Sequence, residues 1–179
     1  MRKLILKMDM SLDGFVGRAE PLPGWPFEYF CEESSAFMLD LISTVGVHAM
    51  GRGAYQEMGP YWQSSTEALA TPMNEIPKAV FSRTLPEDEA TWPETTVYRD
   101  LESGMAELKA QDGPPIISYG GVSFAQELTR LGLVDEYRIN VHPVAFGSGF
   151  PLFGGTVRLE LQDLRRWPTG LVSYTYAAR

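Results

Sequence analysis

Two charged side chains interrupt an apolar stretch near the start of the chain. Lys7 and Asp9 lie two positions apart within Leu4–Met10, a short apolar segment that ends at an Asp-Gly turn and is typical of a β-strand. Alternate strand residues point to the same side of a sheet, so Lys7 and Asp9 share one face. A buried charge is costly unless it is paired or functional. The pair therefore predicts a substrate anchor or proton donor, or else a partly solvated ion pair.

Further candidates for acid–base chemistry and for substrate contacts lie between residues 19 and 43. Glu32 and Glu33 fall near the start of a predicted helix, Glu28–Ser43. They are candidate catalytic carboxylates, although acidic residues also favour a helix start for electrostatic reasons alone. Trp25, in the Pro/Gly/Trp-rich loop 19–26, is a candidate wall for a flat ring, and ordinary packing explains it equally well.

Three short segments carry the groups with which proteins hold phosphate. They are Gly51-Arg52-Gly53-Ala54, Ser82-Arg83-Thr84 and Gly120-Gly121-Val122-Ser123. The first and third follow a predicted strand and open a helix, whose free N–H groups attract anions. In the second, two hydroxyls flank a guanidinium, which suits a phosphate monoester such as the 2′-phosphate of NADP. The alternatives are a tight strand-to-helix turn, a solvated arginine and an ordinary polar strand end.

The elements that must position these residues alternate between strand and helix over most of the chain. Strands are predicted at 4–10, 45–50, 78–82, 95–99 and 115–119, and helices at 28–43, 101–111 and 123–131, with another from Gly51 that closes at 60–62. A polar loop is predicted from there to residue 78. Strands at 136–146, 157–167 and 171–177 then follow without helices. This order predicts an α/β fold with a mostly parallel sheet and an antiparallel end, and a ligand site at the carboxyl edge of the parallel strands.

Composition narrows the function classes. The chain has 179 residues, a net charge of −8, one cysteine and two histidines. We expect a single domain spanning 1–179, no disulfide, no metal site and no nucleic-acid partner. No apolar run approaches the ~20 residues that span a bilayer, and the first residues lack the pattern of a signal peptide, so we expect a cytoplasmic protein without a membrane partner. His48 and His142 fall in predicted strands and are interpreted as packed residues rather than bases.

Five motifs stand in an order that resembles the dihydrofolate reductase-like family. They are MSLDGFVG (10–17), GRGAYQEM (51–58), FSRT (81–84), YGGVSFAQEL (119–128) and LVDEYRINVHPVAFGSGFPLF (133–153). The sequence is most similar to the single-domain branch related to the reductase domain of bacterial riboflavin biosynthesis. This resemblance covers most of the chain and implies a three-layer α/β fold that binds NADPH.

The resemblance also implies roles for the candidate residues. The Gly-Arg turn and the glycine pair would hold the pyrophosphate, Ser82-Arg83-Thr84 the 2′-phosphate, and the loop at Val16-Gly17 would close over the nicotinamide. We then expect Asp9 to face the pocket beside the nicotinamide, as an anchor rather than a proton donor because Lys7 lies next to it.

Two functions follow from this resemblance and from the residues. The first is an NADPH-dependent reductase that transfers hydride to a small heterocycle of the pterin, folate or pyrimidinone type. The second is a non-catalytic NADP-binding module that regulates or binds a ligand. The apolar and aromatic content of 136–146 and 157–177, together with the resemblance, predicts a homodimer through the C-terminal strands.

Overall fold

The strands form one long sheet flanked by helices. The computed structural model describes residues 1–20 and 22–179, and in this part of the chain eight strands pair in the order β5-β4-β3-β6-β1-β7-β10-β9. From β5 to β7 all neighbours are parallel, whereas β10 and β9 are antiparallel to their neighbours. The strands are β1 (Leu4–Ser11), β3 (Val47–Gly51), β4 (Lys78–Phe81), β5 (Thr95–Tyr98), β6 (Ile116–Tyr119), β7 (Glu136–His142), β9 (Leu159–Arg166) and β10 (Val172–Ala178).

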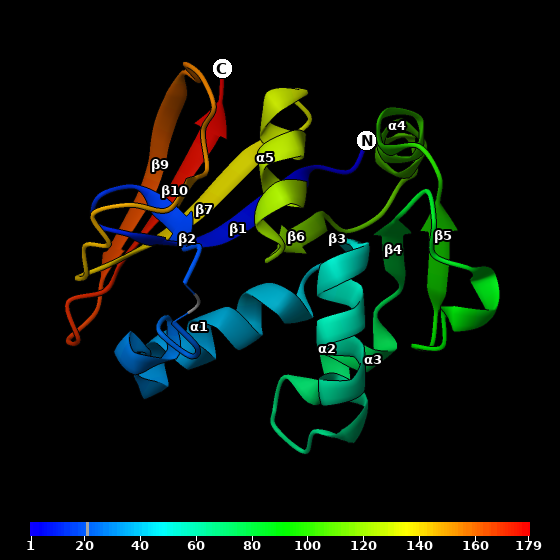
Figure 1. Cartoon of the computed structure of the whole chain (residues 1–179), viewed down its shortest axis with the longest axis horizontal. Coiled ribbons are helices and arrows are strands. Elements are labelled where there is room, and N and C mark those ends of the chain that lie inside the picture. Colours follow the sequence, from blue (N-terminus) through cyan, green and yellow to red (C-terminus); the bar gives the residue numbers. More distant parts are fainter. Residues whose placement is uncertain (21) are drawn as a thin grey trace.

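Helices cover both faces of this sheet (Figure 1). One face packs against α4 (Leu101–Ala110) and α5 (Val122–Arg130), and the other against α1 (Glu32–Ser43), α2 (Arg52–Ser64) and α3 (Ala70–Glu75). The expected three-layer fold, mostly parallel with antiparallel C-terminal strands, is therefore confirmed. None of the described helices is both long and apolar enough to cross a lipid bilayer.

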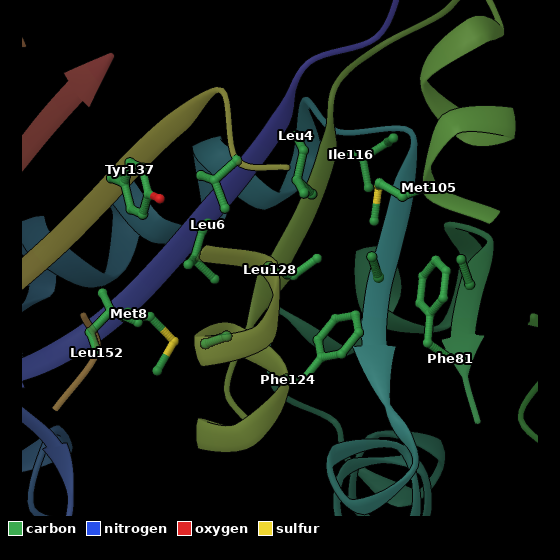
Figure 2. Packing of buried hydrophobic residues seen from close by; sticks show 14 of the residues in the cluster. Leu4, Leu6, Met8, Phe81, Met105, Ile116, Phe124, Leu128, Tyr137 and Leu152 are labelled. Carbon is green, nitrogen blue, oxygen red and sulfur yellow. The ribbon is translucent and has the colours of Figure 1, made fainter. Parts of the chain in front are cut away.

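Strand β1 lies in the middle of the sheet and separates two kinds of side chain. Leu4, Leu6 and Met8 point into the main core, where they meet α5 residues such as Leu128 (Figure 2). Ile5 packs on the opposite side, in a cluster with residues of α1. The alternation predicted for this strand is thus present, and it leaves the intervening charged residues on the α1 side.

The first helix begins later than predicted. A short 3-10 turn, η1 (Phe27–Tyr29), is followed by Phe30 in an extended conformation, and α1 begins at Glu32. Cys31 and Ser34 form a reciprocal cap, in which the Cys31 N–H donates to Ser34 Oγ over 2.8 Å. This cap fixes the helix start and turns the preceding aromatic residues out of the helix. The predicted loop 19–26 contains Pro21, which lies outside the described residues.

Two further expectations on the α2–α3 side were wrong. Helix α2 continues past Pro60 to Ser64, because Trp62 packs against the core and its carbonyl accepts a hydrogen bond of 2.8 Å from Asn74. The segment predicted as a polar loop contains α3, whose Met73 is buried.

The strand predicted at 136–146 is shorter in the structure. Strand β7 ends at His142 because Pro143 has no N–H to continue the ladder.

The ribbon formed by β2 (Phe15–Gly17) and β8 (Phe150–Pro151) was not predicted. Asp13 holds the chain near it, since its carboxylate accepts hydrogen bonds from Ser11 Oγ at 2.6 Å and from the N–H groups of Phe146 and Gly147 at 3.0 and 2.7 Å. The Ser11 hydroxyl and these N–H groups lower the pKa of Asp13 to about 2. Asp13 is thus a turn residue that connects β1 to the segment after β7.

Candidate functional site

The glycine-bearing turns converge at the carboxyl edge of the parallel strands. A Cβ at Gly17 would lie 3.1 Å from Cγ2 of Val122, and one at Gly121 would lie 3.6 Å from Cβ of Ala54. A Cβ at Gly51 would lie 3.3 Å from Cβ of Phe124. Three segments that are far apart in the sequence therefore meet within van der Waals distance. The structure brings together the Val16-Gly17, Gly51–Ala54 and Gly120–Ser123 segments, as a shared cofactor site requires.

Both helices that begin at these turns have uncapped N-termini. Gly51 precedes α2 and Gly121 precedes α5, and neither supplies a side chain to the free N–H groups. Gly120 and Gly121 have φ values of 77° and 74°, in the left-handed region that favours glycine. Gly53, Gly120, Gly121 and Ser123 are all exposed. The two helix starts are thus open to an anionic group.

Arg52 connects the first of these turns to the Ser82–Thr84 segment. Its Nη1 donates to Thr84 Oγ1 over 2.9 Å, and its Nε donates to Gln56 over 3.2 Å. Ser82 Oγ accepts from the N–H groups of Thr84 and Leu85 at 3.2 and 2.9 Å, which shapes the turn after β4. Arg83 is exposed. Two guanidinium groups therefore lie at the same edge of the sheet as the two helix starts.

Val16 differs from the other candidates for cofactor contact. Its side chain is buried in the main core. Only its backbone is available to a ligand, and the adjacent Gly17 is the part of this loop that approaches Val122.

A polar face runs across the sheet on the α1 side. Between β1 and β7, the register places Lys7 opposite Arg138 and Asp9 opposite Asn140. Between β7 and β10, it places Arg138 opposite Thr175 and Asn140 opposite Ser173. Lys7 and Asn140 are each only 7 % exposed. We call this set, together with His142 at the end of β7, the polar face. Its members are Lys7, Asp9, Arg138, Asn140, His142, Ser173 and Thr175.

Asp9 is the hub of the polar face. One carboxylate oxygen pairs with the Lys7 ammonium, and the other accepts from His142 Nε2 at 2.9 Å and from Asn140 Nδ2 at 3.0 Å. Burial alone would raise the pKa of Asp9, but the charge of Lys7 and the hydrogen bonds from His142 and Lys7 together hold it well below its usual range. Asp9 is therefore ionised at neutral pH, which favours the anchoring role over proton donation.

The network continues to the C-terminal strands. Ser173 Oγ donates to Asn140 Oδ1 over 2.6 Å, and Trp167 Nε1 donates to Ser173 Oγ over 2.9 Å. Each polar group thereby restrains the next, so the orientation of Asp9 depends on three strands.

Aromatic side chains from the segment before α1 cover this network. The ring centroids of Trp25, Tyr29 and Phe30 lie 4.9, 5.6 and 6.0 Å from the His142 imidazole, each in an edge-on arrangement. Trp25 also contacts Phe146, and Lys7 Nζ lies 5.6 Å from the centre of the Phe30 ring. The predicted substrate contacts Lys7 and Trp25 therefore meet the same network: Lys7 pairs with Asp9, and Trp25 packs on His142, which binds Asp9.

A small cavity lies between α1 and the polar face. Its volume is about 20 Å³, enough for one water molecule. The lining residues from α1 and the segment before it are Phe30, Ser34, Phe37, Met38 and Leu41. Glu32 and Glu33 do not line it; both are exposed in the first turn of α1, where hydrogen bonding lowers the pKa of Glu33. The structure thus does not bring these two carboxylates to Asp9, and Ser34 is the residue of this turn that faces the cavity.

Sequence reasoning did not single out Arg138 and Asn140, and it interpreted His142 as a packed residue. The structure buries His142 completely and adds its hydrogen bond to Asp9. The signal was present in the segment EYRINVH, where polar residues alternate with Tyr137, Ile139 and Val141. This is the same period of two that singled out Lys7 and Asp9. It marks a second strand with one polar, buried face.

Comparisons with known proteins agree with this fold. The family described as RibD C-terminal domain matches residues 2–173. The uncharacterised protein YyaP of Bacillus subtilis (strain 168) is 28% identical over 185 residues, which cover 98% of this chain and 94% of that protein.

Two solved structures share the fold at low sequence identity. A protein of Shewanella sp. PV-4 named for riboflavin biosynthesis superposes with a TM-score of 0.78, at 21% identity over 99% of both chains. A pyrimidine reductase-like protein of Corynebacterium diphtheriae superposes with a TM-score of 0.70, at 16% identity over 99% of this chain and 92% of that one.

Proposed function

The chain belongs to the RibD C-terminal domain family, and from this premise we propose that it is a reductase that uses NADPH to reduce a small, flat heterocycle. The observation that carries the proposal is the meeting of four segments at one edge of the sheet: Gly17, the turn at Gly51–Ala54, the turn at Gly120–Ser123, and Ser82–Thr84, which Arg52 reaches through Thr84. The polar face lies close by, on the α1 side of β1 and β7; β1 is the direct neighbour of β6, the strand that ends at the Gly120–Ser123 turn.

The residues at the edge fit the charge pattern of NADPH. The uncapped starts of α2 and α5 provide N–H donors for a diphosphate, and Arg52 adds a cation beside them. Arg83 precedes Thr84 in the sequence, and its side chain is exposed. A guanidinium in this position suits the 2′-phosphate that distinguishes NADPH from NADH. When bound, NADPH supplies a hydride.

On the substrate side, this chain supplies orientation and charge. The Lys7 ammonium, held by Asp9, presents a hydrogen-bond donor to an acceptor on the substrate ring. The aromatic residues Trp25 and Phe30 provide apolar surface for a flat ring and exclude water from the polar face. Because Asp9 stays ionised, it does not supply the proton that accompanies the hydride, and we assign that proton to water.

The substrate class follows from the relatives as well as from the site. One solved relative is named as pyrimidine reductase-like and another for riboflavin biosynthesis. A pyrimidinone, pterin or folate-like ring matches the combination of flat aromatic walls with charged hydrogen-bonding groups.

A second candidate function is a non-catalytic NADP-binding module. The feature behind it is the polar face, where the ionised Asp9 offers no carboxylic acid as a proton donor, so the reductase depends on water for that proton.

One experiment separates the two functions. Purified protein is mixed with NADPH and, in turn, with dihydrofolate, pterins, pyrimidinones and flavins, while the absorbance of the reduced nicotinamide is followed. The reductase proposal predicts substrate-dependent loss of this absorbance with at least one ring. Tight NADPH binding without turnover on any of them would support the module instead.

A further inference from the structure

His142 carries a nitrogen that the described network does not use. Its side chain is completely buried, and within residues 1–20 and 22–179 its Nδ1 has no hydrogen-bond partner. A buried polar atom without a partner costs about 1–3 kcal/mol, so native proteins contain few of them. This atom belongs to the residue that binds the hub of the polar face.

The hydrogen bond to Asp9 determines which kind of group Nδ1 is. An ionised carboxylate only accepts, so the Nε2 of His142 that lies 2.9 Å from Asp9 carries the hydrogen. In the neutral ring, Nδ1 is then a hydrogen-bond acceptor with a free lone pair. Lys7, on the other oxygen of the same carboxylate, is a donor. The polar face therefore presents a donor and an acceptor on either side of one carboxylate.

Three aromatic side chains enclose the imidazole of His142. Trp25, Tyr29 and Phe30 approach its imidazole edge-on with centroid distances of 4.9 to 6.0 Å. These three residues belong to the segment between β2 and α1, whose backbone hydrogen bonds run within the segment itself, such as Phe27 N–H to Gly24 O and Phe30 N–H to Phe27 O. Thr169, in the β9–β10 turn, donates to the Tyr29 carbonyl over 2.5 Å. Because His142 is completely buried, a ligand reaches it only when this segment moves outward from the imidazole.

We propose that Nδ1 of His142 accepts a hydrogen bond from a ring N–H of the substrate, and that Trp25, Tyr29 and Phe30 form the aromatic walls of this subsite. His142 then determines specificity: it selects flat rings that carry an N–H donor and rejects the same rings when that nitrogen is alkylated. Asp9 acts through His142 as a positioning residue, because its carboxylate fixes the tautomer that leaves Nδ1 free. This inference rests on the proposed function, since it assigns the substrate side of that site.

A matched pair of probes tests the hydrogen bond. Lumazine is a flat two-ring heterocycle with ring N–H groups, and 1,3-dimethyllumazine has the same ring with those hydrogens replaced by methyl groups. The loss of one hydrogen bond to a buried acceptor predicts that lumazine binds about tenfold more tightly than the dimethyl compound. Binding is measured by titration at neutral pH, where lumazine keeps its ring N–H groups.

The two histidines of the chain provide a direct spectroscopic readout. In the long-range ¹H–¹⁵N spectrum of labelled protein, lumazine should shift the Nδ1 signal of His142, and 1,3-dimethyllumazine should not. His48 is the internal control, because its Nδ1 lies 2.8 Å from the Tyr119 hydroxyl and its Nε2 lies 3.0 Å from the Pro72 carbonyl oxygen. A His48→Gln variant assigns the two sets of signals.

Two substitutions separate the two nitrogens of His142. In His142→Gln the amide can reach Asp9 from the place of Nε2 but leaves nothing at Nδ1, so the preference for lumazine should disappear. In His142→Asn the amide lies near the place of Nδ1 and does not reach Asp9, so part of the preference should return. Should either variant fail to fold, the wild-type spectra with the two probes still decide.

Three results would overturn the inference: equal affinity for the two probes, a shift of His48 without one of His142, or no binding of lumazine. NADPH binding is measured on the same samples. If NADPH binds while His142 fails to respond, only the subsite inference falls. If His142 responds and NADPH does not bind, the proposed reductase function falls and the subsite remains.

Discussion

Asp9 and His142 are 133 positions apart in the sequence, and the hydrogen bond between Oδ1 and Nε2 measures 2.9 Å. The parallel register of β1 and β7 makes this contact possible, since it places Asp9 beside Asn140 and Ser11 beside His142. A slip of one residue would turn every polar side chain of one strand into the main core. The chemistry of the candidate site is therefore specified by strand pairing as much as by residue type.

Asp9→Asn should lower both stability and turnover while NADPH binding is retained. The substitution removes the charge that faces the Lys7 ammonium, whose side chain is only 9 % exposed. A hydrogen bond to a charged group contributes about 1.5–3 kcal/mol, and we expect a loss of that size in urea unfolding. Asp163→Asn is the matched control, because it breaks an exposed pair with Arg165 and should change stability by less than about 1 kcal/mol. Equal losses in the two variants would contradict a special role for Asp9.

The buried His48 should make stability depend on pH. Burial lowers its pKa from 6.5 to about 4, so the unfolded chain takes up a proton in this interval before the folded protein does. Stability should therefore fall as the pH drops from about 6.5 to about 4. His48→Gln should remove most of this slope in urea unfolding followed at several pH values. An unchanged slope would show that other groups cause it.

Substitution of the two arginines at the cofactor edge should have different effects on cofactor choice. Arg83→Ala should weaken NADPH binding by about 1.5–3 kcal/mol, or roughly 10- to 150-fold, and leave NADH nearly unchanged, since only NADPH carries the 2′-phosphate. Arg52→Ala should weaken both cofactors, because Arg52 lies at the start of α2 where a diphosphate would bind. Calorimetric titration of each variant with each cofactor gives the comparison. Equal losses of the two cofactors in Arg83→Ala would remove the 2′-phosphate role.

The C-terminal strands should form a homodimer. On edge strand β9, Leu161 and Leu164 are 53 % and 46 % exposed, and the register places them beside the stacked rings of Tyr176 and Tyr174. This apolar surface lies at the end of the sheet remote from β5 (Figure 1). Light scattering should give twice the chain mass of 20.0 kDa at micromolar concentration, and Leu161→Glu with Leu164→Glu should return the monomer. Gln162→Glu adds one negative charge to β9 without removing an apolar side chain and should stay dimeric.

Local periodicity was enough to predict much of the sheet and one side of the site. The alternation in β1 placed Lys7 and Asp9 on one face, and the glycine turns were located from the strand–glycine–helix pattern. The β2–β8 ribbon was missed because such short strands show no period, and its pairing joins segments far apart in sequence. The position of Glu32 and Glu33 depended on where α1 starts, which the Cys31–Ser34 cap decides. His142 is fully buried, and its hydrogen bond to Asp9 was not predicted because Asp9 lies in another strand.

Calorimetric titration of the unmodified protein with NADPH and with NADH tests the central proposal most directly. The account predicts saturable binding of NADPH with one site per chain, at least tenfold tighter than binding of NADH, because Arg83 contributes a charged hydrogen bond to the 2′-phosphate alone. Absence of NADPH binding, or equal affinity for the two cofactors, would contradict it.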